Sequence, residues 1–135
     1  MTFLTAFTIG IVGMSLDKSK RDFSRNTLLG GVILGVISNW DSRLTSTLEN
    51  LELADHFKFI LPSAVVGSAK PDKKIFEEAL RLSGVKPHEA CHIGDEIKTD
   101  IVGARNVGIY GILIDRDNRF DDFIQPRVKS FLELV

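Results

Sequence analysis

Short apolar runs alternate with stretches of helical periodicity along most of the chain, and this alternation limits the chain to a few folds. Residues 32–38 (V-I-L-G-V-I-S) form an almost unbroken apolar run rich in β-branched residues, as expected of a strand that is covered on both faces. Strands separated by helices imply right-handed βαβ crossovers and a parallel sheet. The predicted strands span residues 32–38, 59–61, 90–93 and 109–114, and the predicted helices span residues 42–53, 73–83 and 99–107.

The ends and buried faces of two predicted helices can be assigned from the sequence. Asp41 is the predicted N-cap of the first helix. Leu44, Leu48 and Leu51 lie at helical spacing and form its predicted buried stripe. The second helix is strongly amphipathic and is followed by Gly84, a residue type that commonly ends helices.

Composition and charge argue against several classes of protein. The chain has 135 residues, enough for one domain with a buried core, and its 44% apolar and 26% charged residues are typical of soluble globular proteins. The net charge of -1 and the scattered basic residues argue against a nucleic-acid or anionic-lipid partner. Residues 1–16 carry no charge, but a membrane-spanning helix needs roughly 20 residues, and no basic residue precedes them as in a signal peptide. We therefore expect no membrane association.

The single cysteine and the uninterrupted later sequence set further expectations. Cys91 leaves no internal disulfide and lies inside an apolar run, which predicts a buried, inert thiol and a reducing, cytoplasmic compartment. No repeat, low-complexity tract or Pro/Gly-rich linker follows about residue 26. We expect an atypical apolar N-terminal segment, residues 1–26, and one core domain, residues 27–135.

The sequence G-D-E-I-K-T-D, residues 94–100, follows a predicted strand at the point where a helix begins. Asp95 would lie on the loop and Asp100 early in the helix, near enough to repel each other unless a cation separates them. A hard, oxygen-seeking ion such as Mg²⁺ would do so, which makes Asp95 and Asp100 the predicted metal ligands. The alternative is that Asp100 or Thr99 merely caps the helix.

Two further segments supply groups suited to binding a phosphoryl group. Lys70 precedes Pro71, which prevents the following helix from extending back through the lysine. Phosphoryl transfer depends mainly on positive charge and hydrogen-bond donors aimed at the phosphoryl oxygens. Lys70 would supply the charge, and the Ser38 hydroxyl and Asn39 backbone N–H, at a strand end, would supply the donors. Taken singly, a loop lysine is usually solvated and a strand-ending serine is common.

The ordered set V-I-S-N, K-P and G-D-x-x-x-x-D in one parallel sheet resembles the haloacid dehalogenase superfamily, and most closely its haloacid dehalogenase-like hydrolase domain-containing proteins. The resemblance covers residues 27–116. It implies an α/β, Rossmann-like, doubly wound parallel sheet and phosphatase-type phosphoryl transfer with Mg²⁺. By this resemblance, Ser38 would bind a phosphoryl oxygen and Lys70 would neutralise the charge of the phosphate and the nucleophile. Asp95 would ligate magnesium, and Asp100 would complete the acidic site.

The family pattern also includes an N-terminal strand that ends in D-x-D, and no match precedes residue 32. The nearest candidate is Asp17, but Ser19 occupies the place of the second aspartate, and a serine cannot act as the proton donor there. The twenty residues between Asp17 and Ser38 leave no room for the cap domain of related members. We expect a core that is incomplete at its N-terminus, has no cap and is impaired or inactive as an enzyme. The alternative is a catalytically dead phosphate- or Mg²⁺-binding or protein-interaction module.

In the family's sheet the missing strand is central, so its loss would leave an apolar edge beside residues 32–38. We expect residues 8–14 to fill this gap. The sequence leaves open whether this apolar edge drives dimerisation, so a homodimer is one of two alternatives for the assembly. For an active chain, the expected partner is a small phosphorylated metabolite.

Other polar and aromatic residues are interpreted as structural. His92 lies inside a predicted strand and is expected to be a satisfied core histidine. Trp40 would either line the mouth of the site or cover the sheet edge. The acidic residues after the last predicted strand are interpreted as solvated surface: Asp115, Asp117, Asp121 and Asp122.

Overall fold

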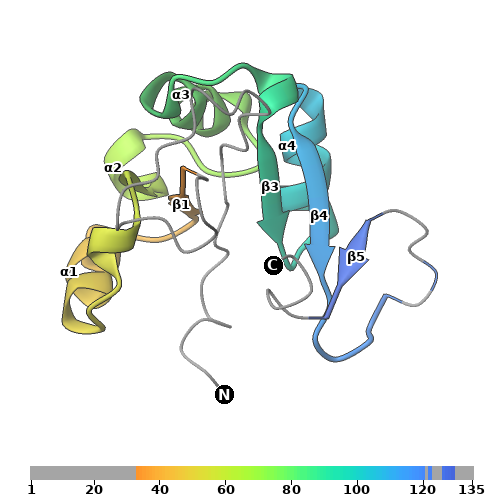
Figure 1. Ribbon diagram of the computed structural model, residues 1–135, viewed down its shortest axis with the longest axis horizontal. Helices are drawn as coiled ribbons and strands as arrows, with labels where there is room; N and C mark the ends of the chain where they lie inside the picture. The colour runs from red at the N-terminus through yellow and green to blue at the C-terminus, as the bar shows by residue number, and fades with distance from the viewer. Residues whose placement is uncertain (1–32, 121, 123–125, 130–135) are drawn as a thin grey trace.

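The structure is a computed structural model that describes residues 33–120, 122 and 126–129 (Figure 1). Short 3₁₀ helices are labelled η3 and η4, and η5 is a π-helical segment. In chain order the elements are β1 (Gly35–Ser38), α1 (Arg43–Asn50), η3 (Ala54–His56), β2 (Phe59–Pro62), α2 (Ser63–Val66), α3 (Lys73–Ser83), η4 (Pro87–Glu89), β3 (Cys91–Gly94), η5 (Ile97–Val102), α4 (Gly103–Asn106), β4 (Tyr110–Ile114) and β5 (Arg127–Val128).

Within the described residues, the strands form two parallel sheets. β1 pairs with β2, and Gly35 lies opposite Phe59. β4 lies between β3 and β5, and Cys91 lies opposite Tyr110. The predicted α/β fold with parallel strands is confirmed, and β5 is a strand that the sequence did not predict.

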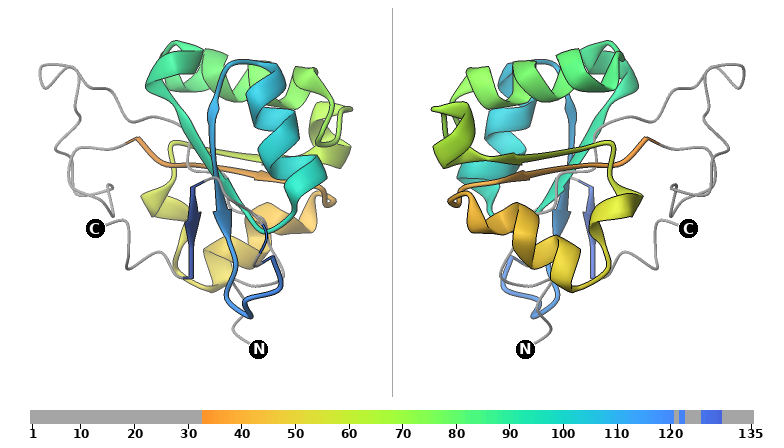
Figure 2. Two further views of the ribbon diagram at one scale, coloured as in Figure 1. Left: turned by 90° about the vertical axis from the view of Figure 1, so that its right-hand side faces the viewer. Right: turned by 90° about the vertical axis from the view of Figure 1, so that its left-hand side faces the viewer.

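The two sheets are not joined through β1 and β3. Among the described residues no backbone ladder links these strands, and Figure 2 shows β1 running across the direction of β3 and β4. This is the place where the family resemblance predicts a central strand. Residues 8–14, predicted to fill it, and the whole segment 1–26 lie outside the described residues.

Two buried clusters connect the β1–β2 sheet with residues in or directly before the strands of the other sheet. The first includes Ile37 of β1, Phe76 of α3 and Ile109 beside β4. The second includes Val36 of β1 and Ile93 of β3. Because successive strand residues point to opposite faces, Val36 and Ile37 place β1 between the clusters. Helices α3 and α1 lie on opposite sides of β1 (Figure 2). The prediction that this strand is covered on both faces is confirmed.

Helix α3 has the bounds that the sequence predicted. The Asp72 side chain accepts a hydrogen bond from the Lys74 backbone N–H at 2.9 Å and caps the first turn. Gly84 follows the last turn with φ 71°, a left-handed conformation that glycine adopts without steric cost.

Helix α1 is shorter than predicted, and one of its three predicted buried residues is wrong. Leu44 and Leu48 are buried, but Leu51 is 39% exposed. The helix ends at Asn50 and the chain turns at Glu52, which has φ 59°, so Leu51 lies beyond the helix and does not continue its buried stripe.

The start of α1 also differs slightly from the prediction. Ser42, not Asp41, occupies the N-cap position. The Asp41 carboxylate still accepts a hydrogen bond from the Arg43 backbone N–H at 2.9 Å. The predicted residue therefore stabilises the first turn from one position earlier.

The predicted helix 99–107 is replaced by η5 followed by α4. In η5 the Ile101 backbone N–H bonds the Glu96 carbonyl, five residues earlier, at 3.4 Å. This wider turn places two consecutive residues, Asp100 and Ile101, in the interior. Such π-helical segments are often found at functional sites.

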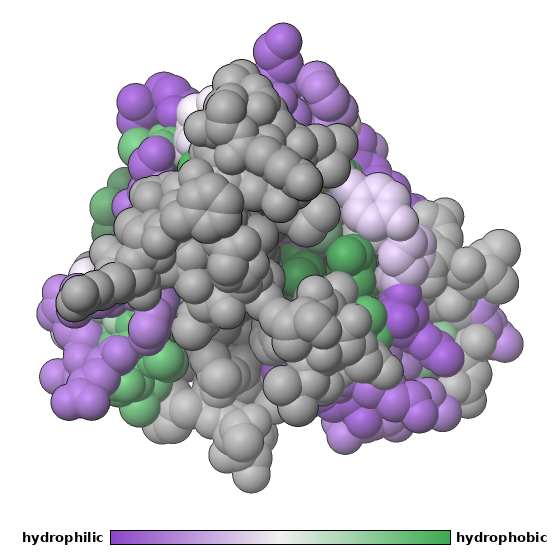
Figure 3. All heavy atoms as spheres, in the orientation of Figure 1, coloured by the Kyte–Doolittle hydropathy of each residue, from purple (hydrophilic) through white to green (hydrophobic). Residues whose placement is uncertain are grey.

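Around the edge of the face shown in Figure 3, most of the described residues are polar. The large exposed hydrophobic residues lie on different elements: Leu51, Val65, Val102 and Tyr110. In the part of the chain that the structure describes, no helix has the length and apolar character needed to cross a membrane.

Candidate active site

The predicted site residues gather around the carboxyl ends of β1 and β3. Ser38 is the last residue of β1, and Asp95 directly follows β3. Lys70 lies on the loop before α3 and contacts both sides: its backbone bonds Asn39, and its ammonium bonds Asp100. The carboxyl ends of parallel strands are where α/β proteins bind ligands.

The Asn39 side chain fixes the backbone of Lys70. Its Nδ2 donates to the Lys70 carbonyl at 2.9 Å, and its Oδ1 accepts from the Lys70 backbone N–H at 2.8 Å. A carboxamide offers a donor and an acceptor in one plane, which a carboxylate of the same shape does not. The sequence predicted a ligand-binding role for the Asn39 backbone, but not this role of its side chain.

Lys70 is buried, although a loop lysine is usually solvated. It is 4% exposed, and its Nζ donates to Asp100 Oδ1 at 2.6 Å. Burial lowers the pKa of Lys70, and the charge and hydrogen bond of Asp100 oppose that shift. The charges of Asp95 and Glu96 also favour the protonated ammonium, so all three acidic groups lie within its electrostatic reach.

Asp100 accepts hydrogen bonds from three directions while fully buried. Oδ1 accepts a hydrogen bond from Lys70 Nζ and lies 3.0 Å from His92 Nε2. Oδ2 accepts a hydrogen bond from the Glu96 backbone N–H at 3.1 Å. Burial opposes ionisation of this carboxyl, but the hydrogen bond of His92 and the charge of Lys70 outweigh it and leave the pKa of Asp100 lowered. The bond from the Glu96 N–H joins Asp100 to the N-cap residue of η5, but Asp100 and Thr99 both lie inside η5, and neither is the N-cap that the capping alternative predicted.

The two predicted metal ligands differ in their surroundings. Asp95 is partly exposed on the loop after β3, where a carboxylate and water molecules suit the oxygen coordination that Mg²⁺ prefers. Asp100 already carries three donors, one of them a cation. Among the described residues, no three His, Cys, Asp or Glu side chains gather closely enough to hold a metal ion. Asp95 therefore fits a magnesium ligand better than Asp100 does, and both assignments stay predictions.

His92 was expected to be a satisfied core histidine, and it is only half satisfied. It is 0% exposed and meets the Phe76 ring edge to face, with ring centroids 5.2 Å apart. Its Nε2 lies on Asp100, but within the described residues its Nδ1 has no hydrogen-bond partner. Because His92 contacts Asp100, it lies at the predicted site. The sequence did not predict this location.

Strand alternation is the signal that could have revealed His92. His92 and Gly94 are two residues apart in β3 and so point to the same face. A Cβ at Gly94 would overlap the Asp100 side chain, which shows that Asp100 packs directly on that face. A polar strand residue two positions before the glycine of the G-D motif lies on the same face of the strand as that glycine. It is therefore placed to contact the second aspartate of the motif.

The prediction that Asp115 is solvated is wrong. It is 2% exposed, and its carboxylate accepts the backbone N–H groups of Arg119 at 2.8 Å and Phe120 at 2.9 Å. The D-x-D pattern occurs once in the chain, as Asp115–Asp117, but Asp115 is occupied in closing this turn. Asp117 and Asp122 are exposed as expected, and Asp121 lies outside the described residues.

Two other sequence interpretations can be compared with the structure. Cys91 is partly buried, and burial raises the pKa of its thiol to about 12, so the predicted inert thiol is supported. Trp40 packs against the second buried cluster, and the Arg43 guanidinium lies 5.5 Å from its ring centroid. This favours the covering role that was one of the two alternatives.

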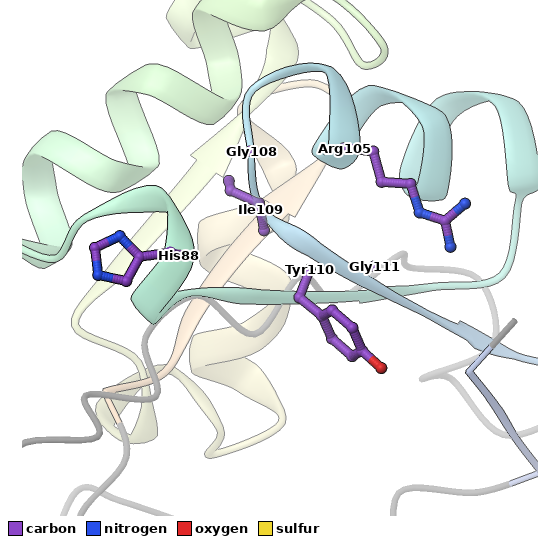
Figure 4. A pocket seen from close by; sticks show the side chains of 6 residues that line it. All are labelled: His88, Arg105, Gly108, Ile109, Tyr110 and Gly111. Carbon is purple, nitrogen blue, oxygen red and sulfur yellow. The ribbon is translucent and has the colours of Figure 1, made fainter.

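A surface cavity of about 370 Å³ lies near the start of β4 (Figure 4). It is lined by His88, Arg105, Gly108, Ile109, Tyr110 and Gly111. Tyr110 is the first residue of β4, so the cavity lies at the amino end of that strand. None of the predicted site residues lines this cavity, and we assign no function to it.

Comparisons with known proteins match the same part of the chain. A family model described as haloacid dehalogenase-like hydrolase matches residues 28–114. Haloacid dehalogenase-like hydrolase domain-containing protein 3 of Bos taurus is 42% identical over 98 residues, which are 73% of this chain and 39% of that protein. Glyceraldehyde 3-phosphate phosphatase of Pyrococcus furiosus is 32% identical over 126 residues, covering 83% of this chain and 52% of that protein.

Solved structures agree with these matches. The crystal structure of an HAD phosphatase from Thermococcus onnurineus is similar with a TM-score of 0.73 and 28% identity, covering 77% of this chain and 49% of that chain. The chain therefore spans only 39% to 52% of the length of the two curated relatives.

Proposed function

The chain belongs to the haloacid dehalogenase-like hydrolase family, and we propose that it binds the phosphoryl group of a small phosphorylated metabolite at the carboxyl ends of β1 and β3. The Ser38 hydroxyl and the Asn39 backbone N–H would donate hydrogen bonds to phosphoryl oxygens. Lys70 would supply positive charge. The observation that carries the proposal is the Lys70 ammonium, buried at 4% exposure and paired with Asp100 at 2.6 Å. Buried ionisable groups with perturbed pKa values are concentrated at functional sites.

Asp95 would hold Mg²⁺ in the proposed site. Its support is the partly exposed position directly after β3 and its location within the electrostatic reach of Lys70. A bound Mg²⁺ would neutralise phosphate charge and orient the phosphoryl group. Asp100 would act through Lys70, as the anion that keeps the ammonium protonated and in place.

We further propose that turnover by this chain is impaired or absent. The support is that residues 1–34 contain no D-x-D and that the single D-x-D of the sequence, Asp115–Asp117, has its first aspartate engaged in a turn. A phosphate- or Mg²⁺-binding or interaction module without catalysis is the second candidate, and it shares the binding site.

A cytoplasmic location fits the inert Cys91 thiol.

The binding proposal can be tested by titrating inorganic phosphate into the full chain, with and without Mg²⁺, by calorimetry. Lys70→Met should weaken phosphate binding about 10- to 100-fold, since a hydrogen bond to a charged group contributes about 1.5–3 kcal/mol. Lys73→Met, on the exposed first turn of α3, is the matched control and should bind like the parent chain. Unchanged binding in a folded Lys70→Met chain would contradict the proposal.

Ser38→Ala gives a second test that leaves the buried ion pair intact. Loss of one neutral donor should weaken binding about two- to tenfold. Ser46→Ala, in an exposed position of α1, is its control. Asp95→Asn should abolish the Mg²⁺-dependent part of the affinity and leave the Mg²⁺-independent part.

Turnover is tested with p-nitrophenyl phosphate and Mg²⁺. We expect no hydrolysis above background by the full chain. Hydrolysis that disappears in Asp17→Asn would show that Asp17 is a working nucleophile and would overturn the proposed impairment. Phosphate binding without hydrolysis would support the non-catalytic candidate.

A further inference from the structure

We propose that His92 is a positioning residue of the phosphate site, which holds the Asp100 carboxylate against the Lys70 ammonium through its Nε2 hydrogen bond. The phosphate-binding part of this inference rests on the proposed function. The positioning of Lys70 does not, because it can be measured without any ligand.

The geometry around Asp100 Oδ1 is the main support. Lys70 Nζ at 2.6 Å and His92 Nε2 at 3.0 Å bind the same oxygen, and all three side chains are buried. Lys70 has a long, flexible side chain, and the Glu96 N–H binds the other oxygen, so these two contacts alone leave the carboxylate some freedom to turn. His92 projects from β3, and the Phe76 ring packs against its imidazole. It therefore gives Oδ1 a donor held on a rigid element.

The surroundings of the second imidazole nitrogen define which nitrogen carries the proton. In the described part of the chain, His92 Nδ1 is buried without a partner. An orphaned buried N–H donor is rarer and more costly than an under-satisfied acceptor. The neutral form with the proton on Nε2 places the lone pair at Nδ1 and the N–H on Asp100. His92 then acts as a neutral donor to Asp100 and adds no second cation beside Lys70.

A purely structural role makes a different prediction. If His92 only filled the core beside Phe76, an apolar side chain of similar size would serve equally well. That replacement would leave Asp100 Oδ1 with one donor instead of two. His92→Leu and His92→Gln separate the roles, because glutamine can place an amide donor near the position of Nε2 and leucine cannot.

The experiment measures acetylation of Lys70 by mass spectrometry in the full chain and its variants, together with the affinity for inorganic phosphate. We expect Lys70 to be protected in the parent chain and in His92→Gln. In His92→Leu, it should react several-fold faster, and phosphate affinity should fall about three- to tenfold, the equivalent of one hydrogen bond. Phe76→Leu is the control for general loosening, because it removes the ring that packs on His92 but no donor to Asp100.

Three results would overturn the proposal: equal protection of Lys70 in the leucine and glutamine variants, equal acetylation in His92→Leu and Phe76→Leu, or a proton on Nδ1 of His92 in long-range ¹H–¹⁵N spectra of the parent chain. The last measurement needs no variant and is unaffected by any loss of folding. If the parent chain binds no phosphate, the proposed function fails, while the acetylation series still decides whether His92 positions Lys70.

Discussion

Two buried carboxylates, Asp100 and Asp115, follow neighbouring strands of one sheet but are stabilised by different parts of the chain. Asp100 is 0% exposed, and two of its donors are side chains that lie 30 and 8 residues away, those of Lys70 and His92. Asp115 is 2% exposed, and its two shortest hydrogen bonds come from backbone N–H groups of its own loop, four and five residues later, while the Arg127 side chain lies farther away at 3.5 Å. One carboxylate joins distant segments, and the other closes a turn.

The direction of the pKa shift does not separate these two roles. For Asp115 as for Asp100, burial opposes ionisation but is outweighed, and the pKa is lowered. The hydrogen bonds from Phe120 and Arg119 and the charge of Arg127 outweigh burial at Asp115. What separates the roles is the origin of the donors. The close donors of Asp100 include a cation from a distant segment, Lys70 at 2.6 Å, which lies near the carboxyl ends of β1 and β3.

The largest expected effect is the loss of stability in Asp100→Asn. The substitution keeps the shape of the side chain but leaves the buried Lys70 ammonium without an anion. Removing one partner of a buried ion pair costs about 3–5 kcal/mol. Urea unfolding followed by circular dichroism measures the change.

Asp115→Asn provides the matched comparison for that variant. It should lose less than half as much stability, because the asparagine side-chain oxygen can still accept one N–H of the turn. Phosphate affinity should be unchanged in Asp115→Asn and reduced in Asp100→Asn. Equal effects of the two substitutions on both measurements would remove the distinction between the carboxylates.

Gly94→Ala should act on Asp100 without changing any charge. A Cβ at Gly94 would overlap the side chain of Asp100 and push it from its position. Overpacking of this kind costs about 1–3 kcal/mol, and it should also expose Lys70 to acetylation. Gly111→Ala is the control, since its Cβ would meet Ile101 only at 3.1–3.4 Å, at Cγ2 and at two backbone atoms, contacts that a shift of a few tenths of an ångström relieves. A Gly94→Ala chain as stable as the parent would contradict close packing of Asp100 on β3.

Much of the fold could be predicted because its signals are local. The bounds of α3 follow from a capping aspartate, a periodic apolar face and Gly84. The parallel sheet follows from apolar runs separated by helices. β5 could not be predicted because it has only two residues, Arg127 and Val128, and carries no apolar run. The π-helical turn η5 was missed because its sequence has the same apolar spacing as an α-helix.

The residues of the candidate site were predicted from sequence motifs, but the contacts between them were not. Asp95, Asp100 and Lys70 were identified from their positions at strand and helix ends. The pairing of Lys70 with Asp100 depends on tertiary packing that no local pattern encodes. Asp115 was misjudged for the same reason, because an acidic stretch after a strand gives no sign that one carboxylate folds back onto its own loop.

Mild acid should destabilise the network around Asp100 before it affects Asp115. Burial lowers the pKa of His92, which faces Asp100 and Lys70. The unfolded chain therefore takes up a proton as the pH falls below the ordinary histidine value of 6.5, while the folded chain does not. Stability is lost as the pH falls, by at most about 2 kcal/mol between pH 7 and pH 5 for one proton.

Comparing urea unfolding at pH 7 and pH 5 in the parent chain and in His92→Gln tests this expectation. The variant should lose most of the pH dependence in that range. A second loss, shared by Asp100 and Asp115, should appear in both chains as the pH falls below about 3.8, since both carboxyl groups have lowered pKa values. An unchanged slope between pH 7 and pH 5 in His92→Gln would assign that dependence to other groups.

The smallest expected effect is that of Arg127→Gln, which tests how local the stabilisation of Asp115 is. Arg127 Nη1 lies 3.5 Å from Asp115 Oδ2 and also donates to the Phe120 carbonyl, and its side chain is 25% exposed. A partly exposed ion pair and one hydrogen bond together contribute about 1 kcal/mol. The loss in urea unfolding should therefore be well below that of Asp100→Asn. A loss as large as that of Asp100→Asn would show that Asp115, too, depends on a distant side chain, and the two carboxylates would then differ only in which cation they hold.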